Sequence, residues 1–240
     1  MVPAWLVDRG AAASFIVVAA ALAVSARFVA RLTGASPHRV EDAYWAGGVL
    51  FLVAGRIAFL ATNSPALVTD LAVLIRFTDG LEPTAGALAA LGWALWRSRG
   101  GADGDLWAAC VAGLALATAT YDLACPVRAS CYGITASPPL GFLMHGLSEP
   151  RLPTPLIEGA ALLIVLGAMT HLLERWTARR VAWALLAALV VTRLATLPIS
   201  VQGAPLAEAV TLGAVALLAA GLAIRSTTDL AASPPAGSAC

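Results

Sequence analysis

Residues 156–173 read LIEGAALLIVLGAMTHLL, a run of eighteen residues that sets the class of the protein. Its ionisable side chains are those of Glu158 and His171, and the other residues are apolar or small. A helix that crosses a bilayer needs about 20 mostly apolar residues, so this run predicts a transmembrane helix. Six further runs of the same kind predict a bundle of about seven such helices, at 11–30, 44–62, 84–98, 106–122, 179–197 and 205–224.

The composition of the whole chain supports a membrane protein. Of its 240 residues, 60% are hydrophobic and 12% are charged, whereas a soluble domain has roughly 45–50% and 25%. This excludes a soluble enzyme and a disordered chain, and the net charge of +1 gives no reason to expect nucleic-acid binding. We predict an all-α, polytopic membrane helical bundle. Residues 1–225 form a single transmembrane domain, and the Ala-, Ser- and Pro-rich residues 226–240 form a disordered cytoplasmic tail.

The arginines predict an orientation, because cytoplasmic loops of membrane proteins are enriched in positive charge. With the N-terminus outside, nine arginines fall on the cytoplasmic side and four on the outer side. The nine are Arg27, Arg31, Arg39, Arg97, Arg99, Arg175, Arg179, Arg180 and Arg225, and the four are Arg9, Arg76, Arg128 and Arg151. We therefore expect the N-terminus outside and the C-terminal tail inside.

The segment 123–155 lies on the outer side in this orientation and is longer than a connection needs to be. Its Pro and Gly content argues against a plain helix. We expect a re-entrant or surface loop that caps the bundle, because irregular backbone at membrane depth must line a cavity or be buried in protein. Within it, Cys125 and Cys131 have a spacing that favours a disulfide or simple packing over a metal site. The sequence predicts no metal and no cofactor.

Several ionisable residues fall within or near the predicted spans, namely Arg56, Asp122, Glu158, His171, Arg193 and Glu208, and the first three together with Arg193 are the candidates for one polar site. Charges in a membrane are costly, and they usually pair with one another or line a pathway. The pattern is therefore consistent with one shared polar cavity. Simpler interpretations stay open as well: Glu158 complements a helix N-terminus, and Asp122 offsets the charge of Arg193.

Several segments, taken in order, resemble the prolipoprotein diacylglyceryl transferase family. Asp122-Leu-Ala-Cys125-Pro-Val-Arg128-Ala-Ser-Cys131-Tyr132-Gly133 is similar to its signature segment, and Arg151-Leu-Pro153-Thr154-Pro-Leu-Ile-Glu158 to its Arg-x-Pro-[Ser/Thr]-x-x-x-Glu segment. Gly55-Arg56-Ile57, the downstream Asn63 and Arg193 also match. The resemblance covers roughly residues 9–224.

Three positions depart from the family pattern. Thr84 stands where the family has a histidine, Asp122 falls where its signature helix has an arginine, and Ser200 replaces a later arginine. Anionic phosphate is bound by Arg or Lys, so a carboxylate at position 122 opposes phosphate binding unless a nearby arginine compensates.

The resemblance implies a reaction in the bacterial cytoplasmic (inner) membrane. Phosphatidylglycerol donates its diacylglyceryl group to the cysteine thiol of a lipoprotein precursor, which makes a phospholipid and lipoprotein precursors the expected partners. The expected catalytic groups are Asp122, Glu158 and His145, with Glu158 also orienting Arg151. The expected substrate-binding residues are Arg56, Arg128, Arg151, Arg193, Gly133, Tyr132 and Asn63. The alternatives are a non-catalytic lipid- or lipoprotein-binding protein on the same bundle, and a transferase with a different donor or acceptor.

Overall fold

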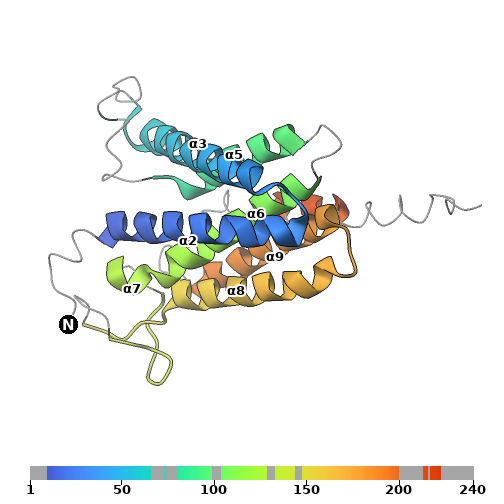
Figure 1. Cartoon of the computed structure of the whole chain (residues 1–240). Coiled ribbons are helices and arrows are strands. Elements are labelled where there is room, and N and C mark those ends of the chain that lie inside the picture. The colour runs from blue at the N-terminus through green and yellow to red at the C-terminus, as the bar shows by residue number, and fades with distance from the viewer. Residues whose placement is uncertain are drawn as a thin grey trace, which may run out of the picture.

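The computed structural model describes residues 10–65, 73, 81–98, 104–128, 133–143, 148–199, 213–215 and 217–222. All regular secondary structure in these residues is helical, and the extended pairing among them is limited to two isolated bridges, at Thr135–Arg151 and Phe142–Arg151. Figure 1 shows the helices running side by side as a bundle. The predicted all-α membrane architecture is confirmed at this level.

Five helices among the described residues are long and apolar enough to cross a membrane. Each corresponds to one of the predicted runs. They are α2 (Gly10–Thr33), α3 (Pro37–Asn63), α6 (Gly104–Leu123), α8 (Thr154–Leu173) and α9 (Ala178–Thr196).

The predicted count of about seven spans is not confirmed. The run 84–98 forms α5 (Pro83–Arg97), whose 15 residues extend about 22 Å at about 1.5 Å per residue, less than the roughly 30 Å of a bilayer core. Of the run 205–224, the described part is a short apolar helix within Gly213–Leu222. The remainder of that run, residues 1–9 and the predicted tail 226–240 lie outside the described residues.

The helix ends follow from local sequence. Pro37 and Pro83 stand in the first turns of α3 and α5, where the missing N–H of proline costs nothing. The Glu82 side chain caps α5 by accepting a hydrogen bond from the Thr84 N–H at 3.0 Å. Gly34 ends α2 with a φ of +79°, a conformation that glycine adopts without a steric penalty.

Helix α6 is the centre of the bundle. In Figure 1 it lies between the α3–α5 pair and the α8–α9 pair, beside α2. Half of its span is buried, against 17–33% for the other four spans, which agrees with its central position. Small residues allow the close approach: a Cβ added to Gly159 of α8 would lie 2.9 Å from the Ala119 carbonyl oxygen of α6.

Candidate functional site

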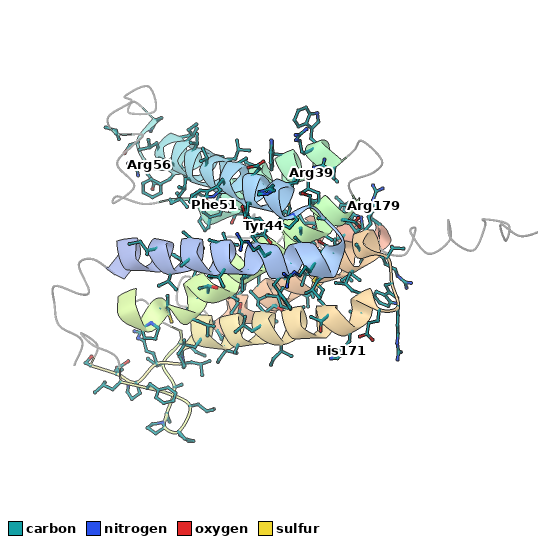
Figure 2. All side chains as sticks on the ribbon, in the orientation of Figure 1. Arg39, Tyr44, Phe51, Arg56, His171 and Arg179 are labelled. Atoms are coloured by element: carbon teal, nitrogen blue, oxygen red, sulfur yellow. The ribbon has the colours of Figure 1, made fainter. Side chains whose placement is uncertain are left out.

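The candidate residues that the structure describes gather at one end of the bundle. The C-terminal ends of α3, α6 and α9 and the N-terminal ends of α5 and α8 all lie at that end, together with the segment that precedes α8 (Figure 1). In Figure 2, Arg56 lies at this end, whereas Arg39, His171 and Arg179 lie toward the opposite one. The alternating helix directions therefore bring together residues that are far apart in sequence.

A buried ion pair joins α8 to α9. The Arg193 guanidinium donates to Glu158 Oε2 at 3.0 Å, and the Glu158 side chain is 3% exposed while that of Arg193 is 43% exposed. The Thr196 hydroxyl lies 3.1 Å from the same Oε2 atom. A buried carboxylate needs a partner. Helix α9 provides two, the charged Arg193 and the neutral Thr196. The arrangement holds the Arg193 guanidinium in place while leaving part of it accessible.

This geometry corrects two expectations about Glu158. Its carboxylate contacts Arg193 and Thr196 instead of orienting Arg151, because Arg151 lies in the segment before α8 and bonds elsewhere. Glu158 is the fifth residue of α8, beyond the first turn, so helix-end complementation does not account for it. The Glu158 carboxylate lies 3.0 Å from the Arg193 guanidinium and offsets its charge. Arg193 and Thr196 are three residues apart in α9 and therefore share a helix face. This spacing is the sequence signal that could have identified Thr196.

Arg151 belongs to a folded segment rather than to a helix. Its Nη1 donates to the Gly133 carbonyl at 3.3 Å. Its backbone exchanges two hydrogen bonds with Phe142, at 2.9 and 3.0 Å. Its Nε is shielded from solvent and has no hydrogen-bond partner among the described residues. A guanidinium carries five N–H donors, so Arg151 retains donors for an anionic ligand.

The short 3-10 helix η4 (Leu197–Ile199), which follows α9, connects this segment to α8. The Ile199 carbonyl accepts from the Ile134 N–H and from the Thr154 hydroxyl, both at 3.0 Å. Gly133 fits between these groups: an added Cβ would overlap Thr154 Oγ1 and the Leu152 carbonyl oxygen, and would lie 2.9 Å from that of Ile199. Glycine is therefore required here by close packing. The resemblance included Thr154 in its second segment without giving it a role, and sequence reasoning missed Ile199, because a backbone carbonyl leaves no signal in the sequence.

Arg56 lies at the same end of the bundle, but its partners differ from those of Arg151 and Arg193. It is 1% exposed, and its Nε and Nη2 donate to the Val73 carbonyl at 3.3 and 2.9 Å. Its guanidinium also lies 5.6 Å from the centre of the Phe59 ring, within the range of a cation–π contact. Arg56, Arg151 and Arg193 thus hold three different partners, and a cavity common to all three stays a prediction.

Asp122 lies in the last turn of α6, against the second turn of α8. A Cβ added to Gly159 would be 3.3 Å from the Asp122 Cβ, so Asp122 packs beside the residue that follows Glu158. Its Oδ2 is shielded from solvent. Asp122 therefore brings a second acidic residue to the contact between α6 and α8.

The remaining predicted residues have weaker or undescribed roles. Asn63 is exposed and donates to the Phe59 carbonyl one turn earlier in α3, at 2.9 Å. Cys125, in the single turn α7 (Cys125–Arg128), is buried and disulfide-bonded, which agrees with the preference for a disulfide over a metal. Tyr132, His145, Cys131 and the side chain of Arg128 lie outside the described residues.

The site combines a fixed, partly accessible guanidinium with nearby carboxylates at the end of a membrane bundle. Such a site can bind an anionic group and accept or position a proton. Within the described residues, no group of three side chains has the arrangement of a metal site. Comparison with protein-family models and with curated proteins found no match.

Proposed function

We propose that this protein is a divergent diacylglyceryl transferase-like enzyme of the bacterial cytoplasmic membrane, with its N-terminus outside. Its donor is phosphatidylglycerol or a related anionic lipid, and its acceptor is the cysteine thiol of a lipoprotein precursor. The observation that supports this proposal is the Glu158–Arg193 pair at 3.0 Å. It joins two residues that the family resemblance singled out from separate helices, and an accessible arginine is suited to a phosphate.

The proposed reaction is a displacement at the glycerol carbon that bears the phosphate. The thiolate sulfur forms the new S–C bond, the C–O bond to the phosphate breaks, and glycerol phosphate leaves with the bonding electron pair. The thiol proton is transferred to a carboxylate or to the departing phosphate. The thiolate is the reactive form of cysteine, so a proton acceptor near the site is required.

In this scheme each of the described residues has a separate role. Arg193 contacts the phosphate, and Glu158 positions Arg193 through the 3.0 Å contact. Arg151, held against the Gly133 carbonyl, supplies a second guanidinium as charge develops on the leaving group. Arg56, whose guanidinium binds the Val73 carbonyl, supports the donor site by fixing the connection between α3 and α5.

Asp122 favours a second candidate function. Its position beside Glu158 adds negative charge where the phosphate would bind, and like charges repel strongly in a low-dielectric site. We therefore expect lipidation with the standard donor to be weak or absent. The second candidate is a protein that uses the same bundle to bind a lipid or a lipoprotein without catalysis, or a transferase with a different donor or acceptor.

Complementation tests these alternatives directly. The chain is expressed in a bacterial strain depleted of its diacylglyceryl transferase, and lipidation of a reporter lipoprotein is measured. Partial lipidation that is abolished by Arg193→Gln supports the enzyme, with Arg179→Gln, at the exposed opposite end of α9, as the matched control. Phosphatidylglycerol binding without lipidation supports the non-catalytic function, and absence of both contradicts the proposal.

A further inference from the structure

The segment between α7 and α8 exposes an apolar tip. Leu140, Phe142 and Leu143 are 67, 58 and 69% exposed, and Ile134 is 43% exposed. Residues 133–143 contain no charged side chain. A cluster of large apolar side chains at the surface marks a contact with a partner or a membrane, so this tip needs an explanation that the proposed catalytic site does not provide.

The backbone of the same segment satisfies many of its own polar groups. The Ala136 N–H donates to the Pro150 carbonyl, the Leu152 N–H to the Ile134 carbonyl, and Phe142 pairs with Arg151 in both directions. The Leu140 and Gly141 N–H groups both donate to the Ser137 carbonyl, at 3.2 and 3.1 Å. Unsatisfied backbone groups are what exclude irregular chain from lipid. Internal pairing of this kind lowers the cost of placing the segment there.

The position of the segment agrees with contact to lipid. In Figure 1 it lies beside the end of the bundle where α8 begins, outward from that helix. It therefore flanks the bundle at the level where the spans end. The adjoining helix α8 exposes its own apolar side chains, among them Ile157, Leu163 and Ile164. The apolar tip lies beside this lipid-facing helix.

We propose that residues 133–143 form a membrane-docking loop whose tip, at Leu140, Phe142 and Leu143, inserts into the outer region of the lipid leaflet beside α8. The occupant of this surface is the lipid of the bilayer itself. At the start of this loop, the Gly133 carbonyl accepts from Arg151 and the Ile134 N–H donates to the Ile199 carbonyl. Insertion of the tip therefore couples the position of Arg151 to the membrane surface. This function depends on the membrane location of the bundle and is independent of the transferase proposal.

Spin-label accessibility tests the loop in the full-length protein. In a Cys110→Ala/Cys240→Ala background, which leaves Cys125 and Cys131 in place, Phe142→Cys is labelled with a nitroxide and reconstituted in nanodiscs of phosphatidylcholine and phosphatidylglycerol. Collision rates with oxygen, which concentrates in lipid, and with a water-soluble nickel chelate are then compared. Glu149→Cys is the matched control, because Glu149 is an exposed, charged residue of the same segment.

We expect a several-fold higher oxygen-to-nickel ratio at position 142 than at position 149. Equal ratios would place the tip in water and overturn the proposal. Protection of position 142 from both reagents would indicate a protein contact, with a second copy or a partner, and would overturn it equally. If Phe142→Cys does not fold, Leu143→Cys gives the same comparison at an adjacent exposed side chain.

Discussion

At the level of single residues, the two members of the Glu158–Arg193 pair differ greatly in exposure, at 3% and 43%. Arg193→Leu leaves a buried carboxylate whose remaining described partner is the Thr196 hydroxyl. We expect it to lower the free energy of unfolding by up to about 3 kcal/mol, the low end of the usual cost of breaking a buried pair. Glu158→Gln keeps hydrogen bonds to both partners and leaves Arg193 accessible to water or headgroups, so we expect a loss of about 1 kcal/mol.

Equilibrium unfolding in mixed micelles measures both losses. Arg179→Leu is the control, since Arg179 is exposed at the opposite end of α9 and surface substitutions usually change stability by less than about 0.5 kcal/mol. Equal losses for Arg193→Leu and Glu158→Gln would show that the difference in exposure has no energetic consequence.

Asp122 carries a prediction about ligand binding. Asp122→Arg should raise the affinity for phosphatidylglycerol by about tenfold, equivalent to about 1.4 kcal/mol, because it replaces repulsion of the phosphate by attraction. Asp122→Asn removes the repulsion alone and should give a smaller gain. Lipid binding by native mass spectrometry compares the three proteins. Full restoration of lipidation by the unmodified chain would show instead that Asp122 is a compensated substitution in a working transferase.

At the level of helices, the contact between α6 and α8 depends on Gly159. A Cβ there would lie 2.9 Å from the Ala119 carbonyl oxygen and 3.0 Å from the Leu123 side chain. Gly159→Val should therefore force the helices apart and cost at least about 2 kcal/mol of stability, in the range measured for overpacking. Because Glu158 is the adjacent residue, the same variant should also reduce any lipidation activity.

Gly167 provides the matched control on the same helix, since nothing lies within 4 Å of a Cβ added there. Gly167→Val should change the unfolding free energy by less than about 0.5 kcal/mol. Similar losses for the two variants in the micelle unfolding assay would mean that valine disturbs α8 itself and not its packing.

At the level of the whole molecule, the bundle makes a topological prediction. The connections at Gly34–Ser36 and Glu174–Thr177 lie at the end of the bundle opposite the candidate site. The arginine distribution predicts that this end is cytoplasmic. Reporter fusions after Arg99 and Arg180 should therefore read as cytoplasmic, and a fusion after Ser137 as external. A cytoplasmic reading at Ser137 together with external readings at Arg99 and Arg180 would reverse the orientation.

Local sequence was sufficient for the individual helices. Five of the predicted runs correspond to α2, α3, α6, α8 and α9, because an apolar run long enough to span lipid must satisfy its backbone internally. The start of α3, at Pro37, lies seven residues before the predicted run 44–62. The run 84–98 was less informative: apolar composition predicted a span, but the helix that forms, α5, has 15 residues. The sequence also singled out Glu158, Arg193, Arg151 and Gly133 as residues of interest, from the cost of charge in a membrane and from the family resemblance.

The pairing of those residues depended on the three-dimensional packing. Glu158 meets Arg193 and Thr196 because α8 and α9 run in opposite directions, so that the beginning of one lies against the end of the other. Arg151 instead turns to Gly133, because the segment before α8 is fastened to the Ile199 carbonyl. Spacing along a chain specifies which side chains share a helix face. Contacts between helices depend on their directions, small-residue packing and backbone hydrogen bonds across distant segments, and these are properties of the assembled bundle.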